Sequence, residues 1–232
     1  MALKEDLQET LAKIFKYRWS QRDGDVVPEP EDLRLANDAV NLEAVVLYAD
    51  MAESTQLVDG YKPFFAAEVY KAYMACAARI VKENAGAITA YDGDRIMGVF
   101  IGASKNSTAA KTALQINWSV SRLINPAIRE QYGQDAHQMK HVVGVDTSKI
   151  FACRIGVRND NDIVWVGPAA NYAAKLSSIN GNYPVYITGT VFDRLNDASK
   201  FGGTPPKIMW EERVWTEMED MRIYGSNWVW GL

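Results

Sequence analysis

Cysteine and histidine are scarce in this sequence, which contains only two of each among 232 residues. Cys76 and Cys153 form no CxxC motif and no cluster with histidine, so neither a zinc site nor a disulfide framework is supported. His137 and His141 both precede a strand-like segment, where a structural role is the better interpretation. Chemistry that depends on a histidine general base or on a Ser-His-Asp triad is therefore disfavoured.

Long apolar runs and an excess of positive charge are also lacking. No uninterrupted apolar stretch approaches the roughly 20 residues that a membrane helix needs, and acids interrupt the apolar pattern of the N-terminus. We therefore expect no signal peptide and no membrane anchor, and the few cysteines favour a reducing, cytoplasmic setting. The formal net charge of -4 argues against a broad nucleic-acid-binding surface.

The length and the composition, with 48% hydrophobic and 23% charged residues, are typical of one globular domain. Within the first 20 residues, Leu7, Leu11 and Ile14 recur at helical spacing and predict an amphipathic helix that packs on the core or on a partner. Residues 21–41 are polar and predict a loop with a short helix near residues 33–40. We thus expect an N-terminal extension over residues 1–41 and a main domain over residues 42–232 that ends in a strand pair.

Apolar periodicity and turn residues predict the elements of the main domain. Strands are expected at residues 42–49, 87–91, 95–101, 141–145, 149–155 and 162–166; helices at residues 63–86 and 107–124 and from residue 168; a strand and a helix within 185–195; and an antiparallel pair within 207–230. Asn125-Pro126 is expected to end the second long helix. The order strand, helix, strand, strand, helix, strand fits a ferredoxin-like α+β fold, an antiparallel sheet with flanking helices.

Two acids stand where such a sheet brings strand ends together. Asp50 ends the first strand, and Asp94 lies in the tight Asp-Gly-Asp turn between the next two strands. Acids at strand ends and in such turns are often plain solvated residues. If the two carboxylates converge, however, they are suitable oxygen ligands for Mg²⁺ or Mn²⁺.

The residues around these acids resemble the metal motifs of the class III adenylyl and guanylyl cyclases. YADMAEST matches the first motif through Asp50, Met51 and Thr55, although Ser54 stands where the family has an aromatic residue, and GDRIMGVF matches the second through Asp94. A third motif, Gly-x-x-x-Asn-x-x-x-Arg at a helix start, appears as GPAANYAAK, with lysine in place of the arginine. Each motif alone is weak, but all three occur in the family's order, and the resemblance covers roughly residues 42–196.

The resemblance implies that the ribose 3'-hydroxyl of a nucleoside triphosphate attacks the α-phosphate and that pyrophosphate leaves. It also implies two Mn²⁺ or Mg²⁺ ions per active site and a head-to-tail homodimer in which each site takes residues from both subunits. The roles that it implies are metal binding for Asp50, Asp94 and the Met51 carbonyl, ribose positioning for Asn171, charge stabilisation for Lys175, and substrate contacts for Lys149 and Thr55.

The two positions that read the base in purine-specific relatives are Ala90 and Val164 here, and neither side chain can form a hydrogen bond. A purine would leave polar groups unpaired at a cost of ~1 to 3 kcal/mol each, so a smaller base read by other residues is favoured. Tyr48, two residues before Asp50, and Arg95, beside Asp94, are the candidates for substrate binding, and Tyr91 is a weaker third.

The whole pattern is similar to that of the pyrimidine cyclases of the bacterial Pycsar antiphage system. This similarity implies an enzyme that favours Mn²⁺ and makes cyclic UMP or cyclic CMP, which activates a separate effector protein. We favour UTP over CTP on the resemblance alone. The alternatives are a purine cyclase with unusual base contacts, a degenerate domain that binds nucleotide without turnover, and a structural protein, which only the tryptophan-rich tail favours.

Overall fold

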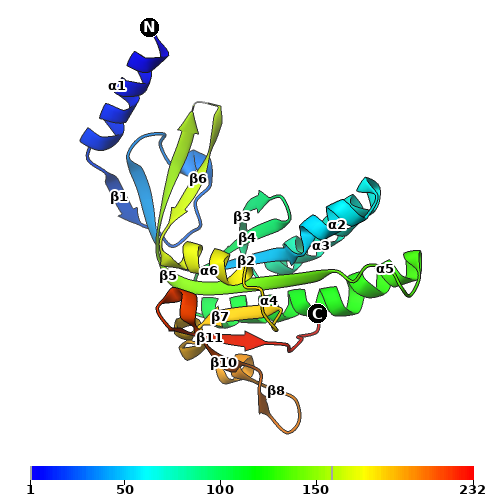
Figure 1. Ribbon diagram of the computed structural model, residues 1–232. Coiled ribbons are helices and arrows are strands. Elements are labelled where there is room, and N and C mark those ends of the chain that lie inside the picture. The colour runs from blue at the N-terminus through cyan, green and yellow to red at the C-terminus, as the bar shows by residue number, and fades with distance from the viewer. Residues whose placement is uncertain (1, 158) are drawn as a thin grey trace.

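Strands and helices are mixed along the chain, and all strands but two join one sheet (Figure 1). The computed structural model describes residues 2–157 and 159–232. The strands are β1 (Ser20–Asp23), β2 (Asp38–Ala52), β3 (Ala87–Asp92), β4 (Arg95–Phe100), β5 (Lys140–Val157), β6 (Asp160–Val166), β7 (Val185–Thr188), β8 (Phe201–Gly202), β9 (Lys207–Ile208), β10 (Glu211–Trp215) and β11 (Met221–Ser226). The helices are α1 (Leu3–Lys16), α2 (Ser54–Gly60), α3 (Pro63–Glu83), α4 (Lys105–Ser119), α5 (Asn125–Tyr132), α6 (Pro168–Ser177), α7 (Gly189–Asp193) and α8 (Asp197–Lys200).

The sheet has the order β10-β11-β7-β5-β2-β4-β3, with β1 paired to β2 and β6 paired to β5. The expected α+β class is confirmed, but the sheet is mixed, because β1 runs parallel to β2 and β7 runs parallel to β5. A parallel neighbour requires a crossover connection. The segment that includes α6 supplies it between β5 and β7.

Successive residues of β2 face opposite sides of the sheet. Val45 and Leu47 pack with α3 and α4 on one side, whereas Ala44 and Val46 pack with α6 on the other. Tyr48 continues the second series, so the next residue of that series, Asp50, lies on the same side of the sheet as α6.

Helix α6 lies unusually close to the central strand β5. A Cβ atom added at Gly144 would lie 2.2 Å from the carbonyl oxygen of Ala173 and 2.6 Å from the amide nitrogen of Ser177. Both atoms belong to the backbone of α6, so no side-chain movement can relieve such a clash. The absence of a side chain at residue 144 therefore sets the distance between α6 and the sheet.

The segment before residue 42 differs from the prediction. The helix expected near residues 33–40 does not form; a single 3₁₀ turn lies at Pro30–Asp32, and β2 already begins at Asp38. Ala39 and Val40 are buried and pair with Cys153 and Ala152 of β5, which pulls them into the sheet. The expected division between residues 41 and 42 thus falls inside β2.

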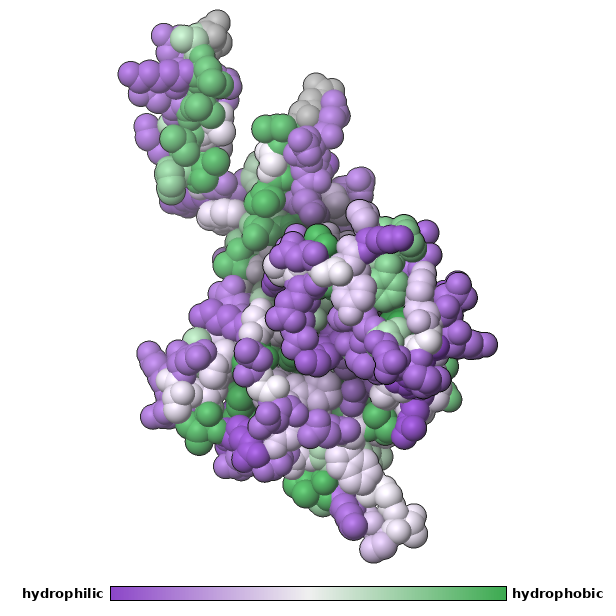
Figure 2. Space-filling view, turned by 45° about the vertical axis from the view of Figure 1, so that its right-hand side comes forward, coloured by the Kyte–Doolittle hydropathy of each residue, from purple (hydrophilic) through white to green (hydrophobic). Residues whose placement is uncertain are grey.

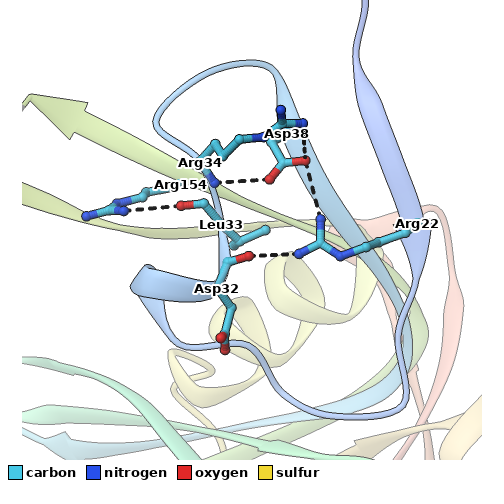
Figure 3. Close-up of polar contacts among 6 residues, drawn as sticks. All are labelled: Arg22, Asp32, Leu33, Arg34, Asp38 and Arg154. Carbon is cyan, nitrogen blue, oxygen red and sulfur yellow. Dashed lines mark hydrogen bonds and ion pairs between the residues drawn. The ribbon is translucent and has the colours of Figure 1, made fainter.

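A buried carboxylate holds this first part of β2 (Figure 3). Asp38 is 3% exposed and accepts hydrogen bonds from the backbone N–H of Arg34, at 3.0 Å, and from the side chain of Arg22, at 3.3 Å. Burial acts to raise the pKa of Asp38, but the Arg34 and Arg22 contacts outweigh it and lower the pKa. Arg154 of β5 also donates to the Leu33 carbonyl at 3.1 Å, so the N-terminal segment is tied to the sheet.

Two further boundaries differ. The segment expected as separate strands at residues 141–145 and 149–155 is the single strand β5, which pairs with β2 from Ala39 to Ala52 without a break. The helix expected to stop at Asn125-Pro126 instead passes through a π-helical turn, Val120–Ile124, into α5. The wider turn tolerates Pro126, which has no N–H to donate. None of the helices in the described residues is both long and apolar enough to cross a membrane.

Candidate active site

The residues of the two predicted metal carboxylates lie where β2 ends and β4 begins, at the same end of these neighbouring strands. Asp50 stands opposite Arg95 in the β2–β4 ladder, and the Met51 N–H donates to the Asp94 carbonyl at 3.3 Å. The turn between β3 and β4 is closed by Gly93, whose positive φ of 61° favours glycine. The turn therefore folds against the end of β2, so that the backbone of Asp94 lies beside the end of that strand.

The pKa of Asp50 is raised to about 6. Burial is the main cause, since the side chain is only 14% exposed. The Arg95 guanidinium lowers the pKa, whereas the charges of Asp94 and Asp92 raise it. This edge of the sheet thus concentrates negative charge in a partly dry environment, which favours binding of a cation.

Arg95 and Tyr48, the candidate base contacts, lie beside Asp50. The Nε atom of Arg95 is 3.5 Å from Oδ2 of Asp50, and its Cζ atom lies 5.9 Å from the centre of the Tyr48 ring. Burial raises the pKa of the Tyr48 hydroxyl, so Tyr48 stays neutral at physiological pH. The structure therefore gathers Tyr48, Asp50 and Arg95 on the α6 side of the sheet, and Asp94 lies next to them in the turn between β3 and β4.

The donor set fits a hard cation that is shared with a substrate. Among the described residues, no group of three or more histidine, cysteine, aspartate or glutamate side chains is placed to hold a metal ion. Mg²⁺ and Mn²⁺ sites of nucleotide-dependent enzymes commonly use one or two carboxylates and complete the shell with phosphate and water. Asp50 and Asp94, with the adjacent Met51 carbonyl, match that pattern and do not match a closed protein cage.

Lys175 lies near this group, and Asn171 lies farther along α6. Lys175 is exposed and lines a pocket of about 770 Å³ together with Arg95. Its Nζ atom is 3.5 Å from the sulfur of Met218, which precedes β11 and lines the same pocket. Asn171 is exposed one helical turn closer to the N-terminus of α6.

Lys149 and Val164 lie toward the other end of the sheet. Lys149 stands opposite Glu43, seven residues along β5 from Val142, the partner of Asp50, which corresponds to roughly 23 Å. Its Nζ atom is 3.5 Å from Asp23 of β1. Val164 pairs with Cys153, still farther along β5. Within one chain, therefore, these residues do not join Asp50.

The other predicted positions lie closer to the carboxylates. Thr55 is exposed in the first turn of α2, directly after β2. Ala90 is in β3 opposite Met97 and is partly buried, whereas Tyr91 is 60% exposed. Neither Thr55 nor Tyr91 forms a side-chain hydrogen bond with another described residue.

Tyr73 is a residue of this site that the sequence did not reveal. It lies on α3, is fully buried, and its hydroxyl donates to the Asp50 carbonyl at 3.4 Å. The tyrosine falls on the apolar stripe of α3, where it is read as an ordinary core residue, so the pattern carries no separate signal. His141, opposite Met51, is also buried, and burial lowers its pKa to about 4, so it is neutral at physiological pH.

No family model matches the chain, but full-length relatives do. The chain is 44% identical over 233 residues to a uridylate cyclase of Xanthomonas perforans, with 100% of both chains covered. It is 45% identical over 232 residues to a uridylate cyclase of Burkholderia cepacia, with 99% of each chain covered.

Solved structures of other cyclases have the same fold. The crystal structure of the guanylyl cyclase Cya2 matches with a TM-score of 0.67 and 16% identity over 82% of this chain and 94% of that one. The adenylyl cyclase CyaB from P. aeruginosa matches with a TM-score of 0.67 and 15% identity over 81% of this chain and 95% of that one. These matches show the class III cyclase fold, and the full-length relatives show that the chain belongs to the uridylate cyclase family.

Proposed function

We propose that this protein is a pyrimidine nucleotide cyclase that converts UTP to 3',5'-cyclic UMP and pyrophosphate. The observation that carries the proposal is the convergence of Asp50 and Asp94 at one sheet edge, next to Arg95 and Tyr48. The names of the full-length relatives support uridine as the base. The retention of both carboxylates argues against a degenerate domain that only binds nucleotide.

The proposed reaction is an in-line displacement at phosphorus. The ribose 3'-oxygen forms a bond to the α-phosphorus, the bond from that phosphorus to the β-phosphate bridging oxygen breaks, and the hydroxyl proton passes to solvent. Asp50 and Asp94, with the Met51 carbonyl, would hold two divalent ions, which would lower the pKa of the attacking hydroxyl and neutralise the charge of the leaving group. We favour Mn²⁺ over Mg²⁺, on the resemblance of the motifs.

The remaining polar residues orient the substrate. Asn171 positions the ribose, and Lys175 stabilises the charge on the reacting phosphate. Lysine is a compact point charge, whereas the arginine of the family motif is a planar fork, so electrostatic stabilisation is kept while the geometry changes. Thr55 and Lys149 contact the phosphates in the proposed complex.

The choice of base follows from which nearby side chains can form hydrogen bonds with it and which cannot. Ala90 and Val164 provide no side-chain hydrogen bond to a purine edge. The guanidinium of Arg95 can donate to a uracil carbonyl, and the Tyr48 hydroxyl can donate or accept. Because both side chains already lie beside Asp50, a small base that reaches them also brings its ribose near the metal carboxylates.

We also propose that the active site is shared between two copies of the chain in a head-to-tail homodimer. Lys149 lies roughly 23 Å along the sheet from the level of Asp50, and Val164 lies farther away. A single chain does not bring these positions to its own carboxylates. A second, antiparallel copy would supply them, together with Asn171 and Lys175. The cyclic product would act as a second messenger in antiphage defence through a separate effector, a role supported by the motif pattern alone.

The decisive test is to incubate the protein with Mn²⁺ and each of the four nucleoside triphosphates separately and to identify products by mass. Cyclic UMP from UTP is the expected main product. Cyclic CMP as the main product would move the assignment to CTP. Formation of cyclic AMP or cyclic GMP without a cyclic pyrimidine would overturn the proposal.

A further inference from the structure

Helix α1 presents an apolar stripe that is not covered by any other described residue. None of its 14 residues is buried. Leu7 and Leu11 are each 51% exposed, and Phe15 is 83% exposed. In Figure 2 hydrophobic side chains follow one side of this helix, which stands apart from the rest of the molecule. A contiguous exposed surface of this kind marks a site of association.

The position of α1 is defined by contacts at its C-terminal end. The side-chain amide of Asn37 donates to the carbonyls of Ile14 and Tyr17, at 2.8 Å each. The next residue, Asp38, is the buried centre of the network in Figure 3. The helix is thus attached to a fixed point of the sheet. A helix of about 12 to 15 residues is only marginally stable alone in water, so α1 needs a partner for its stripe.

The charges on α1 indicate which partner fits. Its first half carries Glu5, Asp6 and Glu9, and its second half carries Lys13 and Lys16. Asp6 and Lys13 are seven residues apart and therefore lie on the same side of the helix, two turns from each other. In an antiparallel pair of α1 helices, Asp6 of each copy lies beside Lys13 of the other. In a parallel pair, the same residues would face like charges.

We propose that α1 packs antiparallel against α1 of a second copy of this chain and buries the apolar stripe between them. Such a contact is isologous, since the same residues of both copies take part, and it adds to the contacts of the proposed head-to-tail homodimer. A membrane surface is the weaker partner. Helices that lie on membranes carry an excess of lysine or arginine on the polar face, whereas Lys4, Lys13 and Lys16 are balanced here by three acids.

The stripe is tested by sedimentation equilibrium of the full chain without nucleotide or metal, so that the result does not depend on the proposed catalysis. Leu7→Glu with Leu11→Glu should weaken self-association by roughly 100-fold or more, because each dimer would bury four acids. Ile208→Glu, at a residue of β9 that is 52% exposed, is the matched control and should change nothing. Wild-type self-association in the double variant would overturn the proposal. The proposal would also be overturned if the wild-type chain bound to phosphatidylglycerol vesicles and the double variant did not.

The antiparallel arrangement is tested by charge reversal. Asp6→Lys and Lys13→Asp should each weaken self-association by roughly three- to ten-fold. An equal mixture of the two variants should form mixed dimers, and the chain that carries both changes should regain wild-type association. If neither single change weakens association, the antiparallel arrangement is wrong, because in a parallel pair each single change only replaces one like-charge contact by another. Because the affected side chains are exposed, the monomer of each variant should unfold at the same temperature as the wild-type monomer.

Discussion

Substitution of Gly144 by alanine is expected to push α6 away from the sheet and to damage the active site from a distance. The new Cβ would lie 2.2 Å from the Ala173 carbonyl oxygen, whereas ordinary contact begins near 3.4 Å. The difference requires α6 to retreat by about 1.2 Å. Overpacking of this kind costs about 1 to 3 kcal/mol, which lowers the unfolding temperature of a domain of this size by about 2 to 12 °C.

The same displacement should reduce catalysis, because Lys175 is carried on α6. A shift of about 1 Å in a positioning element can cost roughly 100-fold in rate. The measurement is kcat/KM for UTP at a temperature where the variant is folded, together with its thermal midpoint. Gly98→Ala is the matched control, since its Cβ would meet side chains and no backbone atom: Val81 at 3.1 Å and Phe100 at 3.6 Å. Wild-type stability and wild-type kcat/KM in Gly144→Ala would refute the reasoning.

Two further variants test the base contact and the buried charges. Arg95→Ala should lower kcat/KM for UTP by roughly 10- to 100-fold and reduce the preference for UTP over ATP, because a charged hydrogen bond is lost; an unchanged preference would remove Arg95 from base reading. Asp146 is buried, and burial raises its pKa despite the hydrogen bond from Thr188 at 2.5 Å. The unfolded chain therefore releases this proton at lower pH, and Asp146 destabilises the fold as pH rises above about 4. In urea unfolding, the free energy of unfolding of Asp146→Asn should increase relative to wild type as the pH rises above about 4. A difference between the two proteins that does not change with pH would contradict this expectation.

The features of the site that the sequence predicted depend on local signals. An Asp-Gly-Asp turn between two apolar runs specifies a hairpin through the turn itself, and a buried strand that ends in an acid places that acid at a sheet edge. Asp50 and Asp94 could therefore be placed from residues close to them in the chain. The pairing of Arg95 with Asp50, by contrast, joins β4 to β2, a strand outside that hairpin, and is a long-range contact that the local turn does not specify.

The features that the sequence missed depend on distant partners. Residues 38–40 join a strand because β1 pairs with all three of them and because Cys153 and Ala152 of β5, more than 100 residues away, pair with Ala39 and Val40. Pro126 does not end the helix, because a π-helical turn before it relieves the lost hydrogen bond. The contact of Tyr73 with the Asp50 carbonyl requires α3 to pack beneath β2, and its apolar periodicity indicates only burial.

The most direct test of the central claim measures the rate of cyclic UMP formation by Asp50→Asn and Asp94→Asn over a range of Mn²⁺ concentrations. Asparagine keeps the shape of aspartate and removes its charge. Each variant should lose about 100- to 1,000-fold in rate even at high Mn²⁺, because a group that holds transition-state charge is lost. The unfolding temperature should not fall, since Asp50 is held in a partly buried, negatively charged environment. A variant of either residue that kept the wild-type rate and Mn²⁺ dependence would contradict the assignment of the metal site.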